Sequence, residues 1–405
     1  MTAQELPIVI VGAGIGGLTA ALAMAQRGIR VTVLEQAREL REVGAGLQIS
    51  PNGTRVLWSL GLERALRAVA VEPQAKEIRL WSSGETWPLF DLGASAVADY
   101  GFPYLMFHRG DLQMALAAAV REAGLHILRL GAEVVDVVDG DGCAEVLLAS
   151  GERVSARAVV GADGVHSRVR ARLFGVAKPV FTGCIAWRGT VPAERLPAHM
   201  RRPVGVNWVG PGRHVVTYPL RRGELVNFVG VVEREGWETE SWTERGSHDD
   251  CAADFAGWHA DVHALIDNID EHYRWALMSR APITRWSAGR IVLLGDAAHP
   301  TLPFMAQGAV MAIEDAIVLA RAFHRFGSDH AAAIGVYETA RVERANRCVS
   351  LAARNRDIFH SDRLLDREDA RRYVATQWSE DKVRERYHWL FSYDAVGGAL
   401  GPPET

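Results

Sequence analysis

Four residues near the N-terminus have the types and the spacing needed to hold a dinucleotide. Gly12, Gly14 and Gly17 form the pattern Gly-x-Gly-x-x-Gly, and Glu35 follows 21 positions after Gly14. Gly12 permits a tight turn, Gly14 lets backbone amides approach a pyrophosphate, and Gly17 allows a helix to pack closely on a strand. The positive end of that helix faces the phosphates. The Glu35 carboxylate is placed to accept hydrogen bonds from a ribose diol, and it would repel a 2′-phosphate.

Three further segments carry polar groups where open α/β sheets bind ligands. Arg109 begins an amphipathic helix, Asp163 ends one strand before Gly164, and Asp296 ends another after Gly295. An Asp at the carboxyl end of a strand, beside a helix N-terminus, lies at the ligand-binding edge of such a sheet. Each alone is equally compatible with an Asp-Gly turn or a helix cap. The three in this order favour a binding site.

His214 and Tyr218 form a candidate acid–base pair. Residues four apart in a strand point to the same side, so both can face one cavity. A neutral imidazole is well matched to accept a proton near pH 7. In the other interpretation His214 is an exposed strand residue and Tyr218 a packing aromatic, and spacing alone favours that interpretation.

The elements around the glycine pattern are those that a dinucleotide site requires. The apolar run Pro7 to Val11 predicts a buried strand, the alanine-rich text up to Gly28 predicts a helix, and Arg30 to Leu34 predicts a second strand. With both strands, the helix and the acid in place, the pattern predicts dinucleotide binding. We find no second unit of this kind, so one dinucleotide is bound tightly and any other visits a site without this fingerprint.

Composition excludes several other classes of protein. The 405 residues are 48% hydrophobic and 23% charged, as in a soluble protein with a large core, and the net charge of -4 does not favour nucleic-acid binding. The four cysteines lie far apart with no Cys-x-x-Cys pair, which argues against a zinc site, a redox dithiol and a disulfide framework. We find no targeting segment and no apolar stretch of the roughly 18 residues that a membrane span needs. We therefore expect a cytoplasmic protein.

Three ordered motifs, GAGIGG, GADGVHS and GDAAHP, resemble those of the single-component FAD-dependent aromatic hydroxylases. This group of flavoprotein monooxygenases is typified by p-hydroxybenzoate hydroxylase and salicylate hydroxylase, and the resemblance covers nearly the whole chain. EVGAGLQISPN, YGFPYLMFHRGDL, GRHVVTYPL and HPTLPFMAQGAVMAIEDA resemble 3-hydroxybenzoate 6-hydroxylases, salicylate hydroxylases and 6-hydroxynicotinate 3-monooxygenases. Many family members have Gly-Gln-Gly where this chain has Ala306-Gln307-Gly308.

The resemblance implies an α/β fold of glutathione-reductase type. A discontinuous Rossmann-like FAD-binding domain would be interleaved with an antiparallel β-sheet substrate domain and followed by a helical C-terminus. The expected boundaries are 1–181 for the FAD-binding domain, with an inserted substrate-facing segment at about 72–105, then 182–280 for the substrate domain, 281–330 for the return of the FAD-binding domain, and 331–405 for the helical region.

The same resemblance implies roles for individual residues. Glu35 would bind the ribose of FAD, Arg109 its pyrophosphate region and Asp296 its ribityl chain, while Asp163 is associated with both FAD and NAD(P)H. Gln48 should lie near the flavin edge or the substrate, and the helix that begins near Gly308 would direct its positive end at the flavin. The residues expected to bind the cofactor are Gly12, Gly14, Ile15, Gly16, Gly17, Glu35, Gln36, Gln48, Arg109, Asp163, Asp296, Gly308 and Ala309.

By resemblance, NADH or NADPH reduces FAD, O2 adds to form a flavin C4a-hydroperoxide, and an OH group is transferred to a phenolate that His214 activates with help from Tyr218. The expected substrate is a small phenolic carboxylate, 3-hydroxybenzoate or salicylate, and a homodimer is expected. A hydroxypyridine carboxylate or a larger phenolic is the alternative, although the hydroxynicotinate enzymes carry His where this chain has Gln48 and Phe304. An FAD protein with a redox-sensing or interaction role, without hydroxylase activity, is the alternative of another class.

Two polar features are assigned no chemistry. His299 has no cluster of ligands at metal-binding spacing around it, so we expect a structural role and no metal site. Arg341 and Arg344 are expected on a solvated helix face, with a contact to a nicotinamide phosphate as the alternative.

Overall fold

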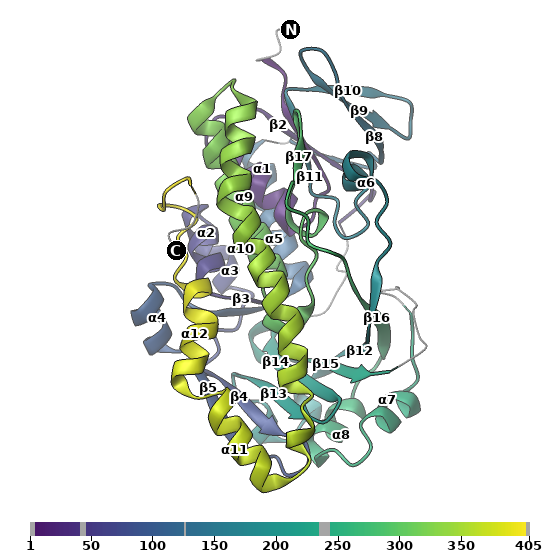
Figure 1. Ribbon diagram of the computed structural model, residues 1–405, viewed down its shortest axis with the longest axis vertical. Helices are drawn as coiled ribbons and strands as arrows, with labels where there is room; N and C mark the ends of the chain where they lie inside the picture. Colours follow the sequence, from purple (N-terminus) through teal and green to yellow (C-terminus); the bar gives the residue numbers. More distant parts are fainter. Residues whose placement is uncertain (1–4, 41–45, 125–126, 235–243, 402–405) are drawn as a thin grey trace.

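Buried aliphatic runs build the first sheet of the computed structural model, which describes residues 5–40, 46–124, 127–234 and 244–401 (Figure 1). This six-stranded sheet is parallel except for its first edge strand. Its central strand is buried at all four positions, as predicted for Pro7 to Val11. The order is β17 (Ser287–Ala288), β18 (Ile291–Leu293), β11 (Ala158–Gly161), β1 (Ile8–Val11), β2 (Val31–Glu35) and β7 (Leu128–Leu130).

Three helices pack beside this sheet and turn their N-termini to its carboxyl edge. The first follows the glycine turn directly and packs against the other two as well as against β1 and β2 of the sheet. They are α1 (Ile15–Ala25), α5 (Arg109–Ala123) and α9 (Gly308–Phe326). The predicted βαβ unit is therefore present.

A seven-stranded sheet forms the second layer, in the lower half of Figure 1. All neighbours are antiparallel except β13 and β4, which pair in parallel. The order is β16 (Tyr273–Ser279), β12 (Val180–Pro192), β15 (Leu225–Glu233), β14 (Arg213–Leu220), β13 (Val204–Gly210), β4 (Ala75–Leu80) and β5 (Thr86–Asp91).

The two faces of this second sheet belong to different cores. Val215 of β14 lies in a cluster with Trp187 and Phe255, beneath α7 (His248–Asp254) and α8 (Ala260–Ile266). Tyr218 lies in the larger cluster that continues into the first sheet. Because side chains alternate along a strand, one face of the sheet is free to build a site while the other is filled by packing.

The remaining elements join the layers. Two small sheets are formed by β3 (Gly46–Ile49) with β6 (Leu105–His108), and by β8 (Val134–Asp139), β9 (Ala144–Leu148) and β10 (Arg153–Ala156). The other helices are α2 (Pro51–Ser59), α3 (Glu63–Arg67), α4 (Ala94–Tyr100), α6 (Arg168–Phe174), α10 (His330–Phe359), α11 (Arg367–Gln377) and α12 (Glu380–Phe391). The 30-residue α10 runs from the first sheet to the second as one rod (Figure 1).

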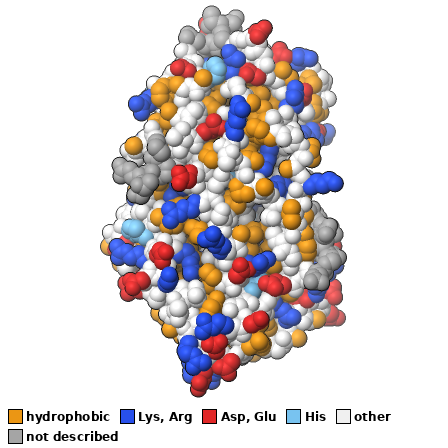
Figure 2. Space-filling view, in the orientation of Figure 1, with side chains coloured by type: hydrophobic (Ala, Val, Ile, Leu, Met, Phe, Trp, Pro, Cys, Tyr) orange, Lys and Arg blue, Asp and Glu red, His pale blue; other side chains and the backbone are white. Residues whose placement is uncertain are grey.

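Acidic and basic side chains are interspersed over the face seen in Figure 2. None of the described helices combines the length and the apolar character needed to cross a bilayer.

Candidate active site

The glycine turn leaves an open space above the N-terminus of α1. A Cβ added to Gly12, whose φ is +102°, would lie 2.5 Å from the Ala162 carbonyl oxygen, and one added to Gly17 would lie 2.1 Å from that of Gly12. A Cβ at Gly14 would meet nothing within 4 Å, and no side chain caps the helix there. Close packing therefore requires two of these glycines, and the third faces a vacant region lined by backbone N–H donors, as a pyrophosphate requires. Gly16 packs α1 on α9, and Ile15 is buried at the start of α1.

Glu35 is held across this turn by backbone hydrogen bonds. Its Oε2 accepts the N–H of Ala13 and its Oε1 accepts the N–H of Ala37, both at 2.8 Å. The carboxylate lines a cleft of about 980 Å³ that Gly12, Gly14, Gln36, Arg109 and Asp163 also line. The residues predicted for the ADP portion of the cofactor thus border one cleft.

Asp163 serves as a helix cap at the edge of that cleft. Its carboxylate accepts the Ser167 hydroxyl at 2.5 Å and the N–H groups of Arg168 and Val169 at the start of α6. Burial raises its pKa, against the effect of these hydrogen bonds. The capping interpretation left open by the sequence is therefore realised, and Asp163 still borders the cleft.

A second carboxylate and a second helix N-terminus lie close to each other, and neither is among the residues that line that cleft. Asp296 follows β18, and its exposed side chain has no hydrogen bond to a described residue. A Cβ at Gly308, the first residue of α9, would lie 3.9 Å from Asp296 Oδ1, and no side chain caps α9. Ala309 follows in this uncapped first turn. Although the Asp296 side chain is exposed to the open space, the protein around it reduces its solvation and raises its pKa, and the charges of His299 and Arg109 partly offset this rise.

The prediction that Arg341 and Arg344 lie on a solvated face is wrong. Both guanidinium groups are buried: Arg341 pairs with Glu314 and Asp315 at 2.7 Å, and Arg344 pairs with Glu314 at 2.8 Å. The reason is that α10 is covered by α9 on one side and by the C-terminal segment on another, where Arg344 lies 3.9 Å from the Tyr393 ring centroid.

His299 belongs to the same buried network, as a structural role requires. Its Nε2 lies 2.5 Å from Asp315 Oδ2, which also accepts the N–H of Gly295. Burial alone would raise the pKa of Asp315, but His299 and Arg341 outweigh it and hold that pKa below its usual value. The network therefore fixes the loop that presents Asp296.

His214 is buried on the face of β14 that looks toward the first sheet. It is 1% exposed, and its ring lies 5.3 Å from that of Phe304 and 5.2 Å from that of Phe359. Burial, with the adjacent His360, lowers its pKa well below the usual value, so the imidazole is neutral. Its Nδ1 contacts His360, and its Nε2 has no partner among the described residues. The interpretation of His214 as an exposed strand residue is wrong.

Tyr218 and Gln48 lie together on the same face. The Gln48 side chain hydrogen bonds with Tyr218 and accepts the Tyr104 hydroxyl at 2.7 Å. All three are buried, and burial raises the pKa of Tyr218 far above its usual value. Tyr218 is therefore a neutral hydrogen-bonding group, placed on the side that spacing predicts.

Lys76 is a site residue that sequence analysis missed. It lies on β4 opposite Gly205, and its ammonium lies 5.7 Å from the Tyr104 ring centroid. It has no ion pair or hydrogen bond with a described residue, and burial lowers its pKa to about 8. Lys76 alternates with Glu77 along β4, so the two charged side chains point to opposite faces of the sheet, and the chain has three lysines in all. This pattern in the sequence could have drawn attention to Lys76.

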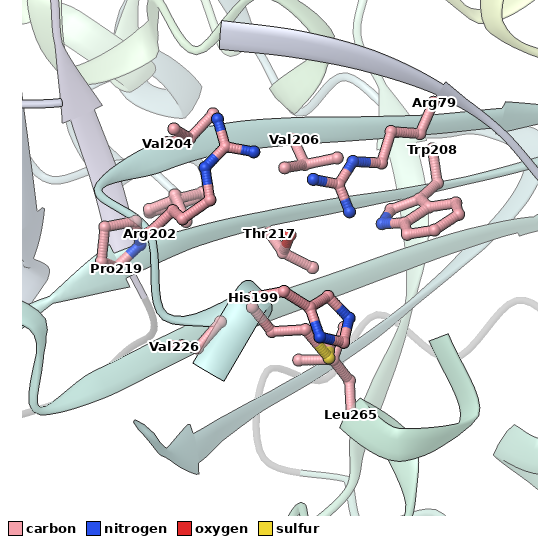
Figure 3. Close-up of a pocket in the computed structure, with 12 residues that line it drawn as sticks. Arg79, His199, Arg202, Val204, Val206, Trp208, Thr217, Pro219, Val226 and Leu265 are labelled. Carbon is pink, nitrogen blue, oxygen red and sulfur yellow. The ribbon is translucent and has the colours of Figure 1, made fainter. Parts of the chain in front are cut away.

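The opposite face of the sheet carries a hollow that is too small for a substrate. Thr217, Arg79 and Trp208 line it together with His199 (Figure 3), and its volume is about 30 Å³. That is room for about one water molecule. This hollow therefore cannot hold an aromatic substrate.

These features fit FAD and define a class of protein. An uncapped helix N-terminus, a carboxylate at the end of β2 and a second carboxylate after β18 suit an extended dinucleotide, and a buried neutral imidazole lies among aromatic rings on the second sheet. The fold and the site are those of a flavin-dependent aromatic hydroxylase.

The chain belongs to the FAD binding domain family, whose profile matches residues 5–352. It is 40% identical to 6-hydroxynicotinate 3-monooxygenase of Bordetella bronchiseptica over 97% of this chain and 96% of that protein. It is 37% identical to 3-amino-4-hydroxybenzoate 2-monooxygenase PtnB3 of Streptomyces platensis over 96% of each. It is 34% identical to 3-hydroxybenzoate 6-hydroxylase of Polaromonas naphthalenivorans over 98% of each.

Solved structures agree with this assignment. HpxO of Klebsiella pneumoniae, complexed with FAD and uric acid, matches with a TM-score of 0.81 and 28% identity over 98% of this chain and 99% of that one. A salicylate hydroxylase substrate complex has the same fold, with a TM-score of 0.80 and 24% identity over 98% of this chain and 100% of that one. The resemblance, the fold class and FAD as cofactor are thus confirmed, and the protein is an FAD-dependent monooxygenase.

Proposed function

We propose that this enzyme hydroxylates a small phenolic carboxylate of the 3-hydroxybenzoate or salicylate type, with His214 as the base. The observation that carries the proposal is a neutral, buried imidazole with an unpartnered Nε2 between Phe304 and Phe359. A hydroxypyridine carboxylate is the second candidate, because the Bordetella relative named for such a substrate is 40% identical.

His214 would remove the proton of the ring hydroxyl. An ionised oxygen pushes electron density into the ring and favours attack by an electrophilic oxygen. A neutral imidazole can take that proton, whereas a protonated one cannot. Tyr218 stays protonated and can donate a hydrogen bond to the same oxygen. FAD, held by the cleft residues and reduced by NADH or NADPH, supplies the activated oxygen atom.

Lys76 would bind the substrate carboxylate. Gly205 lies on the strand between Lys76 and the strand of Tyr218, so no side chain of β13 separates them at that level. An ammonium without a counter-ion is costly in a buried place, and a carboxylate in the pocket supplies one. Hydrogen bonds between charged groups contribute about 1.5–3 kcal/mol, which corresponds to about 10- to 150-fold in affinity.

Activity across a panel tests the substrate. NADH and NADPH oxidation by the flavoprotein is measured with 3-hydroxybenzoate, salicylate, 4-hydroxybenzoate and 6-hydroxynicotinate, with product identification. Large stimulation and a dihydroxybenzoate product support the proposal. Stimulation by 6-hydroxynicotinate alone would establish the second candidate. No stimulation would refute both.

A lysine substitution tests the carboxylate contact. Lys76→Met should raise KM for the active acid at least 10-fold and leave the weak binding of the matching carboxamide unchanged. Lys178→Met, at an exposed position, is the control. Equal KM values for the acid in both variants would contradict the assignment. Cytoplasmic location, expected from the sequence composition, and a homodimer, implied by the resemblance, stay predictions.

A further inference from the structure

A continuous line of three side chains connects His214 with the surface. His214 Nδ1 lies 2.6 Å from His360 Nε2, and His360 Nδ1 lies 2.8 Å from Glu233 Oε1. The first two side chains are almost fully buried, whereas that of Glu233 is 49% exposed. The line therefore begins in the aromatic cage and ends in solvent.

Three elements hold this line in place through their backbones. His360 is the C-cap of α10, and its carbonyl oxygen accepts the N–H of Gly212, just before β14, at 3.0 Å. The N–H of Glu233, at the end of β15, donates to the Gly212 carbonyl oxygen at 2.9 Å. The C-terminus of a helix also favours a passing positive charge. The spacing of the three side chains is thus set by secondary structure.

A buried base needs such a connection because the proton that it accepts must leave. Phe304 and Phe359 pack against the His214 ring, which is 1% exposed, so bulk solvent does not take the proton from it directly. A neutral imidazole accepts a proton at one nitrogen and donates from the other, so two in series can pass a proton without either holding charge for long.

We propose that His360 and Glu233 are positioning residues that carry the His214 proton to solvent, an inference that rests on the proposed role of His214 as base. The substrate O–H bond breaks as His214 Nε2–H forms, and His214 Nδ1–H breaks as His360 Nε2–H forms. His360 Nδ1–H then breaks as Glu233 takes the proton and passes it to water. Return of a proton to the product oxygen reverses each transfer and restores both tautomers.

The charged neighbours of His360 are consistent with this task. Burial lowers the pKa of His360, while Glu233 raises it and Arg356 opposes that effect; Asp357 also contributes. Cys184 of β12 lies close enough to Glu233 and His360 that the three could surround a metal ion. Burial raises the pKa of that thiol to about 11, so it is neutral at pH 7 unless a cation binds. The hydrogen-bonded line accounts for the geometry without a metal.

Rapid mixing of the oxidised holoenzyme with the active panel compound tests the proposal. A pH-indicator dye measures proton release, and ring absorbance measures ionisation of the substrate. His360→Gln should slow both at least 10-fold, with substrate Kd within twofold and FAD content unchanged. Glu233→Gln, at a half-exposed position, should slow proton release about 3- to 10-fold and flatten its pH dependence. Glu224→Gln, exposed before β15, is the matched control.

The outcomes separate this proposal from the proposed function. Wild-type proton release in both His360→Gln and Glu233→Gln would overturn the proposal, as would a stoichiometric metal ion lost in the His360 variant. If His214→Asn abolishes hydroxylation while those two variants behave as wild type, the base stands and the path fails. If His214→Asn hydroxylates normally, the proposed function itself fails.

Discussion

Replacing Arg341 with Met should destabilise the protein through the buried network that fixes the loop carrying Asp296. The substitution keeps most of the volume of the side chain and removes a guanidinium that pairs with Glu314 and Asp315 at 2.7 Å. Glu314 keeps Arg344 as a partner, while Asp315 keeps only His299 and one backbone N–H. Removing one partner from a buried ion pair costs about 3–5 kcal/mol.

The size of the thermal effect follows from the length of the chain. Unfolding entropy is about 2.1 cal/mol/K per residue, so Tm should fall by about 1 °C per kcal/mol in 405 residues, or about 4–6 °C in total. Because Asp315 also holds Gly295 and His299, FAD should be lost more readily on dilution. Thermal melting of the FAD-loaded protein and flavin fluorescence after gel filtration measure the two effects.

An exposed arginine on the same helix provides the control. Arg354→Met makes the same change at an exposed position of α10, where the guanidinium has no ion pair or hydrogen bond with a described residue, and it should move Tm by less than about 1 °C, as surface substitutions usually do. If Arg341→Met and the control had the same Tm, the buried ion pairs would make no net contribution to stability. The proposed support of the Asp296 loop by α10 would then be refuted.

Three further outcomes are expected. Gly14→Ala should leave the stability of the apoprotein unchanged and weaken FAD at least 10-fold, whereas Gly12→Ala should lower the stability itself, as urea unfolding and FAD titration would reveal. Ala306→Gly should stabilise the protein by up to about 1 kcal/mol in urea unfolding, because Ala306 has φ +54° and only glycine adopts that region without a penalty. The free energy of unfolding should fall as pH drops below about 6.5, because His214 and His360 bind protons in the unfolded chain but have lowered pKa values in the folded protein. The slope is about 1.4 kcal/mol per pH unit for each group. His214→Asn should reduce this slope between pH 7.5 and 5.5.

Local patterns predicted the geometry of the glycine turn and the position of Glu35 beside it. The turn from Gly12 to Gly17 and the acid at Glu35 are close in sequence, and their chemistry depends on backbone geometry that spacing reveals. The sequence did not decide the role of Asp163, because a carboxylate that follows a strand can cap a helix or bind a ligand from the same position. Ala306 shows the opposite case, because it has αL backbone angles although an alanine in the sequence does not indicate them.

Groups that meet across distant segments were not predicted. Arg341 is a charged residue on α10, and the sequence of this helix does not indicate that other parts of the protein cover it on two sides. The sequence therefore predicts that Arg341 is exposed. His360 lies 146 positions from His214, and Lys76 gains its significance only because β4 pairs with β13. In each case tertiary contact, which no local period encodes, decides the role.

The single rod of α10 imposes a rule on how this protein can change in length. Arg341, in the middle of α10, supports the loop that carries Asp296. His360 caps the end of the same helix, about 28 Å further along at 1.5 Å per residue. One inserted residue between them would advance the cap by 1.5 Å and rotate it by about 100°, which would turn the imidazole away from His214. Insertions and deletions should therefore be confined to the surface loops on either side of α10. The length of α10 therefore fixes the distance and the relative rotation between the Asp296 loop and the His214 side chain's contact with His360.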